Sequence, residues 1–403
     1  MKAFLRFAEK FFTVTALLLF SKAVLGVVRS GASSVSSAEG DSFLQVIWFG
    51  IYTITFCLLA VQWRGFTRIP KNIIKPILLL TGVALFSFFW SDVPSVTLRR
   101  SIALVGTTLF GIYFATRYSP KEQLRLLAWA LGTAAVLSLV FAVALPGYGI
   151  DVYPFAGAWR GVYSQKNLLG RFMSMSALIF LLVALSTRKH RWIAWSIFGL
   201  STALILLSTS KTALIIFATL LILLPFYKAL RWQYSVSIPI FIMAILAFAG
   251  FAIWFTTEAE TVLGYFGKDI TLTGRTELWY IVFKMIQQHP WLGYGYSGFW
   301  LGARGPSGYI WDVIGWPAPH AHNGFLDLWL DLGIIGLLAF IASFVMTLGQ
   351  AIAYIRQTKT WEAFWPITFL TAFFLLNLAQ STIVAQNDLI WIIYVSLNFL
   401  KPL

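Results

Sequence analysis

The stretch HAHNGFLDLWLDLGIIG, residues 320–336, joins two histidines and an asparagine to the front of a long apolar segment. That segment continues to about residue 355. It is long enough to cross a bilayer, because a helix rises about 1.5 Å per residue and the hydrocarbon layer is about 30 Å thick. The chain has only four histidines in 403 residues. Imidazoles at the mouth of a membrane span therefore call for a chemical explanation.

Apolar segments of this kind recur along the whole chain. Hydrophobic residues make up 59% of it and charged residues 11%, and the mean hydropathy is +0.79, whereas charged residues are about a quarter of a typical soluble domain. We therefore predict an all-α, polytopic membrane protein in which residues 1–403 form a single transmembrane domain. Twelve spans are predicted, at 11–29, 43–62, 73–90, 101–117, 124–145, 168–186, 191–208, 212–230, 235–255, 333–355, 362–383 and 387–400.

Two features of the composition narrow the chemistry. Cys57 is the only cysteine and lies inside an apolar run, which excludes a disulfide within the chain and a zinc site built from cysteines. The first apolar segment has no clear cleavage site of small residues after it. We therefore interpret it as a retained helix and not as a signal peptide.

Lysine and arginine residues indicate how the spans are oriented. The chain carries 30 of them against 15 acidic residues, a net charge of +15. With the N-terminus in the cytoplasm, most of these cations fall in short cytoplasmic connections, as the positive-inside rule requires. We expect both termini in the cytoplasm, contacts with the lipid bilayer through anionic headgroups, and no nucleic-acid partner.

A second set of cations falls on the opposite, outer side of the predicted spans. Cations there oppose the insertion bias and invite a functional interpretation; the alternative is that each reaches lipid phosphate. Lipid contact is favoured for Arg29, Lys211, Lys268 and Arg304. The cations considered for a functional role include Arg99, Arg100, Arg160, Lys166, Arg171 and Arg275.

The largest outer segment is a loop at 256–321, between the ninth and tenth spans, which is longer than connections usually are. Arg275 falls in the first turn of a predicted amphipathic helix over about 275–288, where exposed N–H groups attract anions and a guanidinium binds phosphate through two hydrogen bonds. We favour this over simple pairing with Glu277. The apolar residues that recur at helical spacing are Leu278, Ile281, Val282 and Met285.

A second cationic passage is WRGVYSQKNLLGR, residues 159–171. Arg160, Lys166 and Arg171 lead into the sixth span, and three cations at a membrane mouth could neutralise a pyrophosphate. The alternative is that they anchor the chain at the lipid interface beside Trp159 and Tyr163.

Glycines and aromatic residues alternate in PWLGYGYSGFWLG, residues 290–302. Gly293, Gly295 and Gly298 match a dinucleotide-binding pattern, which we reject because the segment follows a helix and not a strand. The aromatic residues could stack on sugar rings or rest on the lipid interface; they are Tyr294, Tyr296, Phe299 and Trp300.

The histidines of the opening stretch suit proton transfer better than metal binding. A zinc site needs a third ligand, and His289 is the only plausible third imidazole, so no metal site is predicted. A neutral histidine, which titrates near pH ~6.5, can accept a proton from a hydroxyl. Asn323 would cap the following helix and direct His322 away from lipid. The alternative for each histidine is an interfacial side chain with one nitrogen in water.

The stretch HNGFLDLWLDLGIIG resembles the signature of the O-antigen ligase and polymerase superfamily. His322, Asn323, Gly333 and Gly336 match every fixed position of that pattern. GRTELW, with Arg275, is similar to the loop arginine of the same family. WRGVYSQKNLLG resembles its earlier element, and WSDVPSVTLRRS (90–101) resembles its third outer turn.

This resemblance implies a fold and an activity. The family consists of GT-C-like membrane glycosyltransferases of the bacterial inner membrane, with the active site facing the periplasm. They move a glycan from an undecaprenyl-pyrophosphate donor to a sugar hydroxyl acceptor, with inversion and without metal or cofactor. The acceptor is lipid A core for ligases and a second lipid-linked glycan for polymerases. The resemblance assigns His322 and Arg275 to catalysis, and Asn323, Arg160, Lys166, Arg171, Arg99 and Arg100 to substrate binding.

Three functions stay open on the sequence alone. The SDVPSVTLRRS region leans toward an exopolysaccharide or O-antigen polymerase, and a ligase acting on lipid A core is the first alternative. A flippase for lipid-linked oligosaccharides is the more distant one. It would need a basic cavity but no base at His322, and it would usually have interrupted helices or paired halves, which the sequence does not indicate.

Overall fold

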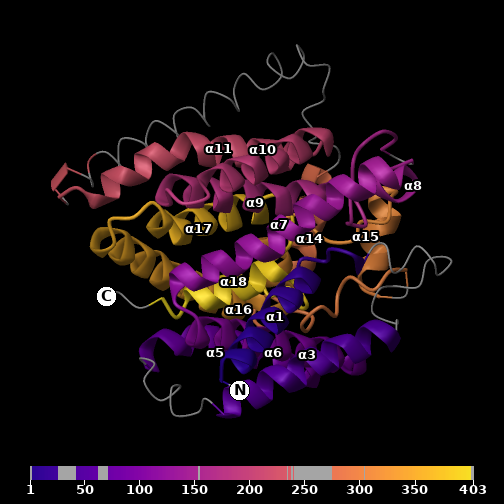
Figure 1. Ribbon diagram of the computed structural model, residues 1–403. Helices are drawn as coiled ribbons and strands as arrows, with labels where there is room; N and C mark the ends of the chain where they lie inside the picture. The colour runs from indigo at the N-terminus through magenta and orange to yellow at the C-terminus, as the bar shows by residue number, and fades with distance from the viewer. Residues whose placement is uncertain are drawn as a thin grey trace.

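The computed structural model describes residues 2–25, 42–61, 71–152, 155–233, 235–236, 239, 275–303 and 305–400. Over these residues the chain is helical, and its β-pairing is limited to one isolated bridge between Ile150 and Trp159. The prediction of an all-α protein is confirmed. The helices in Figure 1 are α1 (Lys2–Phe20), α3 (Ser42–Val61), α5 (Lys71–Phe86), α6 (Pro94–Arg117), α7 (Pro120–Ala144), α8 (Pro146–Gly149), α9 (Lys166–Ser186), α10 (Arg191–Leu207), α11 (Lys211–Phe226), α14 (Arg275–Gln288), α15 (Ser307–Ile314), α16 (Gly324–Gln357), α17 (Trp365–Asn377) and α18 (Leu389–Leu397).

The described helices are those of a multi-pass membrane protein. Large hydrophobic side chains such as Phe49, Trp129 and Leu338 stand exposed, as a lipid environment allows and a soluble surface rarely shows over wide areas. Helices long and apolar enough to cross a bilayer lie at Phe43–Val61, Pro120–Ala144, Lys166–Ser186, Lys211–Arg231 and Gly324–Gln357. Shorter apolar helices cover Pro76–Phe89, Arg191–Leu207 and Glu362–Asn377. The total of twelve spans stays a prediction, and the ninth (235–255) falls almost wholly outside the described residues.

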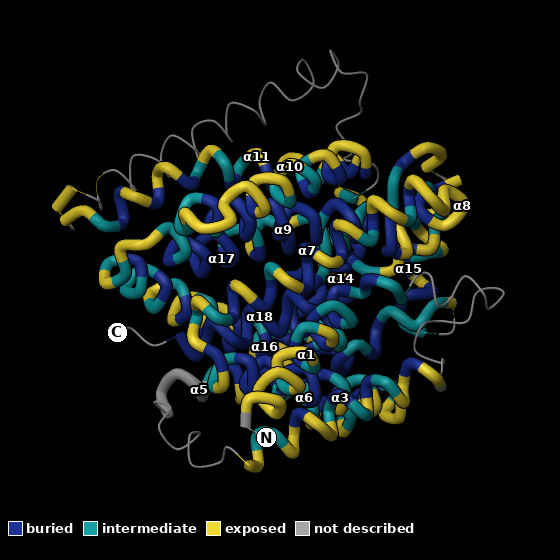
Figure 2. Tube along the Cα trace, in the orientation of Figure 1, coloured by how far each residue is buried: buried dark blue, intermediate teal, exposed yellow. Residues whose placement is uncertain are grey.

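The core lies along the middle of the bundle. In Figure 1, α9, α10 and α11 lie toward the top, α3, α5 and α6 toward the bottom, and α16, α17 and α18 between them. Trp391 and Tyr394 of α18 are fully buried, and the Trp391 indole donates to Thr108 Oγ1 of α6 at 3.0 Å. Figure 2 shows buried residues gathered between the helices and exposed residues on their outer sides. The short α18 is therefore enclosed by protein.

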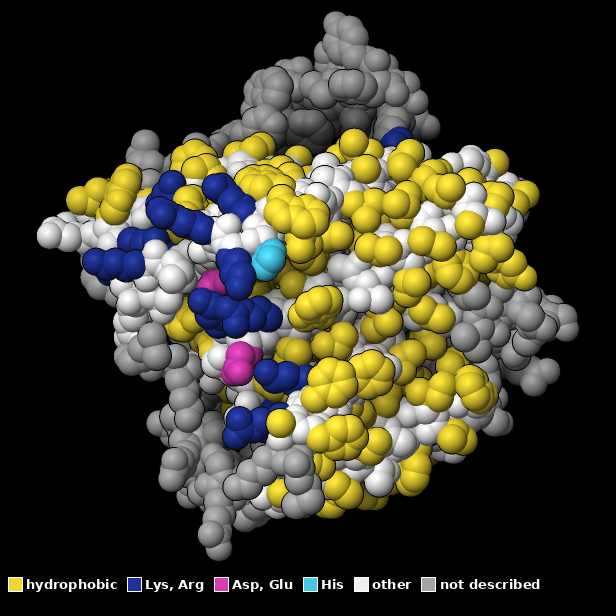
Figure 3. Space-filling model, viewed as in Figure 1, with side chains coloured by type: hydrophobic (Ala, Val, Ile, Leu, Met, Phe, Trp, Pro, Cys, Tyr) yellow, Lys and Arg dark blue, Asp and Glu magenta, His cyan; other side chains and the backbone are white. Residues whose placement is uncertain are grey.

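The two ends of the bundle differ in charge. Figure 3 shows Lys and Arg side chains gathered at one end, at the left, while hydrophobic side chains cover most of the remaining described surface. We call this the basic end; its connections carry Arg117, Lys121, Arg125, Arg188, Lys189 and Arg191. The opposite end, which we call the site end, carries α8, α14 and α15 (Figure 1). A second hydrophobic cluster joins α14 and α15 to α16 there, with Leu278, Ile310 and Leu330 fully buried.

The first predicted span, 11–29, is wrong at residues 21–24, because α1 ends at Phe20 and a turn follows it; residues 26–29 lie outside the described residues. Ser21 Oγ donates to the Leu18 carbonyl at 2.6 Å and accepts the Ala23 N–H at 3.3 Å. Lys22 and Val24 then adopt positive φ values of 63° and 69°, a region that disfavours a helix and is rare for a β-branched residue. The Val24 N–H donates to the Val162 carbonyl at 2.9 Å, so the turn is held by a distant segment.

The predicted spans 362–383 and 387–400 are also longer than the helices there. Between α17 and α18 the chain leaves the helix, and the Asn377 side chain replaces the missing backbone bonds: its Oδ1 accepts the N–H groups of Thr382 at 2.8 Å and Ile383 at 3.2 Å. Non-helical backbone is tolerated at membrane depth only where protein or a water-filled cavity surrounds it. We call residues 378–388 the connecting segment.

The backbone of α16 is interrupted at Gly333, which has φ 65° and ψ −170°. The expectation of uninterrupted helices is therefore wrong for α16. Residues 290–294, which follow α14, supply the hydrogen bonds that the helix lacks at this break. Ile334 N–H donates to the Pro290 carbonyl and Tyr294 N–H to the Leu330 carbonyl, both at 2.9 Å. A Cβ atom at Gly333 would lie 2.0 Å from the Trp291 carbonyl oxygen. The motif glycine is thus required by backbone conformation and by close packing.

We predict that Gly333→Ala destabilises the protein by at least about 2 kcal/mol, because alanine disfavours the left-handed conformation and its methyl group would overlap Trp291. Gly349→Ala on the same helix is the matched control. Nothing lies within 4 Å of a Cβ there, and alanine in a helix is neutral or stabilising by up to about 1 kcal/mol. Thermal unfolding of both variants in detergent measures the difference. Equal midpoints would contradict this account of the interruption.

Candidate active site at the mouth of α16

The site is built on the N-terminus of α16. Asn323 is the N-cap, with φ −153°, and its Oδ1 accepts the N–H groups of Phe325 at 3.0 Å and Leu326 at 3.3 Å. The predicted cap is confirmed. His322 directly before it has φ 54°, an unusual conformation for a non-glycine residue and one that is often found at functional sites. The cap and this turn together fix the backbone of His322 directly before the first turn of α16.

Asp327, one turn into α16, fixes the loop that carries the histidines. Its Oδ1 accepts the Ala321 N–H at 3.0 Å and the Trp300 indole N–H at 2.8 Å, and its Oδ2 accepts the Ser381 hydroxyl. The Ala321 carbonyl accepts the Trp279 indole N–H of α14 at 2.8 Å. The N–H and the carbonyl of Ala321, the residue between the two histidines, are therefore both hydrogen-bonded.

The two histidines contact each other. Nδ1 of His320 accepts the His322 backbone N–H at 3.0 Å, and the ring centroids are 4.2 Å apart. Because Nδ1 accepts a hydrogen bond, a neutral His320 carries its proton on Nε2. His320 forms this hydrogen bond with the His322 backbone and not with the His322 ring nitrogens. The centroid of the His322 ring lies 6.1 Å from that of the Trp316 ring.

Burial and nearby cations make both imidazoles weak bases in the free protein. Burial, together with the nearby charges of Arg171 and Arg275, lowers the pKa of His320 to about 4. Burial likewise lowers the pKa of His322 to about 4, together with His320 and Arg275, while Asp327 opposes the shift. The expected titration near pH 6.5 is therefore wrong, and both rings are neutral at pH 7. These shifts also place Arg171 and Arg275 in electrostatic reach of the same imidazole.

Arg275 begins α14 and is partly buried. Within the described part of the chain no carboxylate forms an ion pair with it, so the alternative of pairing with Glu277 is not observed. The capping positions 273 and 274 lie outside the described residues. Arg275 therefore brings a positive charge close to both histidines, and no carboxylate of the described residues forms an ion pair with it.

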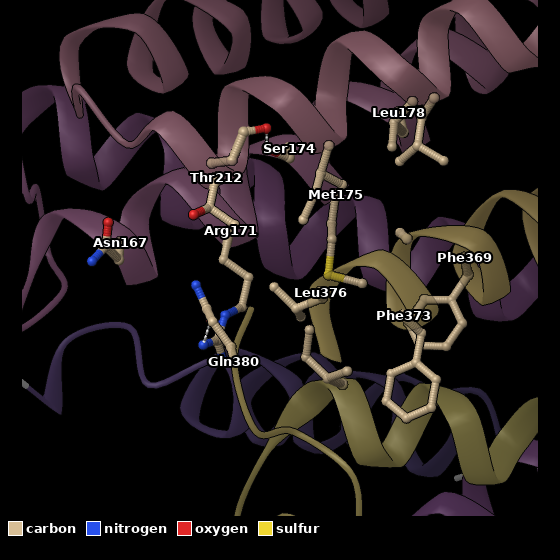
Figure 4. A pocket seen from close by; sticks show the side chains of 15 residues that line it. Asn167, Arg171, Ser174, Met175, Leu178, Thr212, Phe369, Phe373, Leu376 and Gln380 are labelled. Carbon is tan, nitrogen blue, oxygen red and sulfur yellow. Dashed lines mark hydrogen bonds between the residues drawn. The ribbon is translucent and has the colours of Figure 1, made fainter. Parts of the chain in front are cut away.

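Arg171, in the second turn of α9, is the second arginine near the histidines. Its side chain is 13% exposed, and it lies 3.8 Å from Asp388 Oδ2 and donates to Gln380 Oε1. Figure 4 shows Arg171 and Gln380 side by side, with Met175, Leu376 and Phe373 extending away from them. These residues line a narrow apolar crevice of about 30 Å³ between α9, α11 and α17. The guanidinium thus stands at the polar end of an apolar crevice.

Arg99 and Arg100 lie at the start of α6 and line a much larger cavity of about 780 Å³. Arg100 Nη1 donates to the Ser297 carbonyl at 2.5 Å. Lys22 lines the same cavity and lies 3.0 Å from Asp388 Oδ2. Asp388, which is 1% exposed, therefore contacts both Lys22 and Arg171.

Two predicted binding residues have partners within the protein. Arg160 Nε donates to the Tyr148 carbonyl at 2.8 Å, and its Nη1 lies 3.5 Å from Asp151. Lys166 Nζ donates to Thr209 Oγ1 at 3.1 Å and lies 3.9 Å from the centroid of the Phe155 ring. The structure brings Arg171 and Arg275 together at the histidines. The substrate-binding roles of Arg160 and Lys166 stay predictions.

The aromatic residues after α14 are packed inside the protein. Tyr294, Tyr296 and Phe299 are 6%, 3% and 0% exposed, and the Trp300 indole is held by Asp327. Stacking on sugars and contact with the lipid interface are therefore both wrong for the three buried rings. A Cβ at Gly295 would lie 2.5 Å from Ser91 Cβ, so this glycine allows close packing.

Sequence reasoning missed three acidic or amide side chains that organise the site: Asp327, Asp388 and Gln380. Asp327 and Asp388 could have been found from the sequence, because both lie within apolar segments, and a charge at membrane depth is costly unless it is paired. No group of three His, Cys, Asp or Glu residues in the described ranges is arranged to hold a metal ion.

Comparisons with known proteins agree with each other. The family model described as O-antigen ligase matches residues 196–341, which include α14, the histidine loop and the first half of α16. The exopolysaccharide production protein ExoQ of Rhizobium meliloti (strain 1021) is 27% identical over 345 residues, covering 83% of this chain and 77% of that protein. Both matches support the O-antigen ligase and polymerase superfamily, which confirms the resemblance of the motifs.

We predict that two imidazoles titrate near pH 4 in the free protein. Both are neutral above that pH, and the neutral form is lost as the pH falls through about 4. Arg275→Gln should raise both pKa values, because it removes a cation that disfavours imidazolium. NMR titration of labelled histidines checks this, and Arg125→Gln at the basic end is the matched control. Titration of His320 and His322 near pH ~6.5, the value of an exposed histidine, would contradict the prediction.

Proposed function

We propose that this chain belongs to the O-antigen ligase and polymerase superfamily, as its matches to that family suggest, and that it is an inverting membrane glycosyltransferase. It moves a glycan from an undecaprenyl-pyrophosphate donor to a sugar hydroxyl on a lipid-linked acceptor, as an exopolysaccharide or O-antigen polymerase does. The observation that carries the proposal is the histidine loop, which Asp327 holds at the mouth of α16 within electrostatic reach of Arg171 and Arg275.

The charge distribution supports a location and an orientation. The basic end would face the cytoplasm of the bacterial inner membrane, since short connections rich in lysine and arginine stay on that side. The site end, with the loop at 256–321, would then face the periplasm. In this orientation the donor reaches the histidines on the side where the translocated carrier presents its glycan.

Arg171 and Arg275 are the proposed ligands of the donor pyrophosphate. Negative charge grows on the phosphate oxygens as the anomeric bond breaks, and fixed guanidinium groups stabilise that charge. Arg171 also stands at the polar end of the crevice that Met175, Leu376 and Phe373 line.

His322 is the proposed general base. The acceptor oxygen attacks the anomeric carbon, its proton passes to the imidazole, and the bond from that carbon to the phosphate oxygen breaks, so the pyrophosphate leaves with the electron pair. Because the leaving group is already a pyrophosphate, this step requires no cofactor and no acid at the leaving oxygen. We propose that it also proceeds without metal. A single displacement inverts the anomeric configuration.

The low pKa of His322 ties its basicity to the donor. Near Arg275 the free imidazole is neutral but weakly basic. A bound pyrophosphate adds negative charge beside the cations, and a nearby anion favours imidazolium and raises the pKa. We therefore propose that the base reaches its working strength only when the donor is in place, which limits activation of water in the empty site.

The choice of polymerase over ligase is supported by the similarity to ExoQ, which is described as an exopolysaccharide production protein. A ligase that uses lipid A core as the acceptor remains the alternative. A flippase would leave the glycan on its carrier. Incubation of the purified protein with a lipid-pyrophosphate glycan and an acceptor separates these functions: a transferase releases carrier pyrophosphate, whereas a flippase moves the intact glycan to the other leaflet.

We predict that His322→Ala lowers turnover by about 10²–10⁴-fold, the usual contribution of a general base, while the protein still binds lipid-linked donor. His320→Ala should stay within about tenfold, because His320 orients the loop through Nδ1 and takes no proton from the acceptor. Turnover and donor binding are measured in parallel. Near-normal turnover of His322→Ala would overturn the assignment, and so would loss of donor binding.

We predict that Arg275→Ala lowers kcat far more than Arg99→Ala does. Arg275 lies near both histidines and would stabilise the leaving pyrophosphate in the transition state, whereas Arg99 lines the separate, larger cavity. Steady-state kinetics with saturating donor and acceptor compares the two variants. If Arg99→Ala abolished transfer and Arg275→Ala did not, the donor site would have been placed on the wrong cations.

A further inference from the structure

Tryptophans surround the histidine loop, and most of them hold the fold through their indole N–H groups. Three of these groups donate to the loop, to the segment before it or to Asp327, each at 2.8 Å; they belong to Trp279, Trp300 and Trp311. Trp316 differs from them. Its indole N–H has no hydrogen-bond partner among the described residues, and its side chain is partly exposed. This tryptophan is therefore available to a ligand.

Trp316 lies beside the proposed base. The centroid of its ring is 6.1 Å from the centroid of the His322 ring, and the two planes are inclined at 41°. Within the described residues, His320 is the other ring that contacts His322. Because the planes are tilted and not stacked, the imidazole does not cover the face of the indole. An aromatic surface thus stands next to the group that takes the proton.

The backbone around Trp316 is rigid. The segment GWPAP, residues 315–319, follows α15, and Gly315 ends that helix with φ 75°. The ring of Pro317 fixes the backbone directly after the tryptophan, and the Ala318 N–H donates to the Trp316 carbonyl at 3.0 Å. The side chain of Trp316 also packs on the second hydrophobic cluster. The indole is therefore positioned before a ligand arrives, which lowers the entropic cost of binding.

A partly exposed indole with an unused N–H is complementary to a sugar ring. The face of an indole carries the negative side of its quadrupole, and a pyranose presents a face of weakly positive C–H groups that packs against it. The hydroxyl groups project from the edge of the pyranose, where the indole N–H can donate to one of them. Binding pockets commonly combine such an aromatic surface with a few polar groups that fix orientation.

We propose that Trp316 forms a subsite for the acceptor sugar, in which the ring that carries the attacking hydroxyl lies against the indole face. The inference rests on the proposed function and adds to it a residue that selects the acceptor. A sugar with an uninterrupted C–H face fits this subsite, whereas a bulky substituent on that face prevents the contact.

The position of the base decides between the acceptor sugar and the donor sugar. The attacking hydroxyl must come within about 3 Å of the imidazole, so its ring lies next to His322, where Trp316 stands. The donor sugar is bonded to the diphosphate, which the proposed function places at Arg171 and Arg275. In a single displacement the attacking and the leaving oxygens lie on opposite sides of the anomeric carbon. The indole therefore serves the attacking side and the guanidinium groups the leaving side.

Kinetics with a lipid-free acceptor tests this assignment. The acceptor is the repeat oligosaccharide released by mild acid from the extracted lipid-linked glycan, and the intact lipid-linked glycan is the donor. We expect Trp316→Ala to raise the acceptor KM about tenfold, with the donor KM changed less than about twofold and kcat less than about threefold. Trp316→Phe should recover most of the effect, because it restores an aromatic face, whereas Trp316→Leu should not.

The split between KM and kcat separates sugar binding from a structural role. Loss of a contact made equally before and in the transition state raises KM alone, whereas a displaced histidine loop would lower kcat. The matched control is Trp192→Ala, because Trp192 is a 69% exposed tryptophan at the basic end. A fall in kcat without a change in acceptor KM would overturn the subsite, and so would a rise in the donor KM alone.

Saturation-transfer NMR of the same oligosaccharide with the protein in nanodiscs gives a readout independent of turnover. We expect the C–H protons of its terminal sugar to receive the strongest saturation from the unaltered protein and from Trp316→Phe, and to lose it with Trp316→Ala. Absence of saturation transfer from the unaltered protein, or equal transfer from Trp316→Ala, would overturn the subsite while leaving the proposed function intact. Failure of the unaltered protein to transfer glycan to either the oligosaccharide or a lipid-linked acceptor would refute the proposed function itself.

Discussion

A single carboxylate holds the site end together. Asp388 is 1% exposed, caps α18 by accepting the Ile390 N–H at 2.9 Å, and contacts Lys22 and Arg171. A buried charge is tolerated only when partners compensate the loss of water. The end of α1, the start of α9 and the start of α18 must therefore meet at this point. The connecting segment can leave the helical conformation because these helices enclose it.

The fold was predictable where it depends on apolar length and on charge. Continuous apolar runs predicted the membrane helices around α7, α9, α10 and α11, and lysines and arginines in short connections marked one end of the bundle. The misplaced helix ends share a cause. The turn after Phe20 depends on a hydrogen bond to Val162, and the end of α17 depends on the Asn377 side chain folding back onto Thr382 and Ile383. Neither interaction leaves a periodic pattern in the sequence, and the apolar run continues past both turns.

The site was predictable where a motif fixes local geometry. The spacing from His322 and Asn323 to Gly333 describes one structural unit: a capped helix start, and a break that lets residues 290–294 pack into the helix. Asp327 holds the histidine loop through Ala321, Trp300 and Ser381. These contacts could not be predicted, because Ala321 bonds through its backbone N–H and the other two residues are distant in the sequence. The weak basicity of the imidazoles arises from burial and from Arg171 and Arg275, which meet only in the folded chain. Arg160 is held by Tyr148 and Asp151 of its own loop, whereas Lys166 is held by Thr209, which lies in the distant turn between α10 and α11.

The same constraint explains why this chemistry suits a membrane protein with few charges. A lipid-linked donor brings its own negative charge, so cations that are costly beside buried histidines become favourable when the diphosphate arrives. Before that, Arg275 keeps the imidazole of His322 neutral and weakly basic, and the rigid backbone of the loop keeps it in place. In the function proposed above, charge complementarity between protein and substrate would therefore supply both binding and the timing of catalysis. Asp327 holds the histidine loop and Asp388 holds Lys22 and Arg171, so the fold itself positions both the imidazoles and the cations.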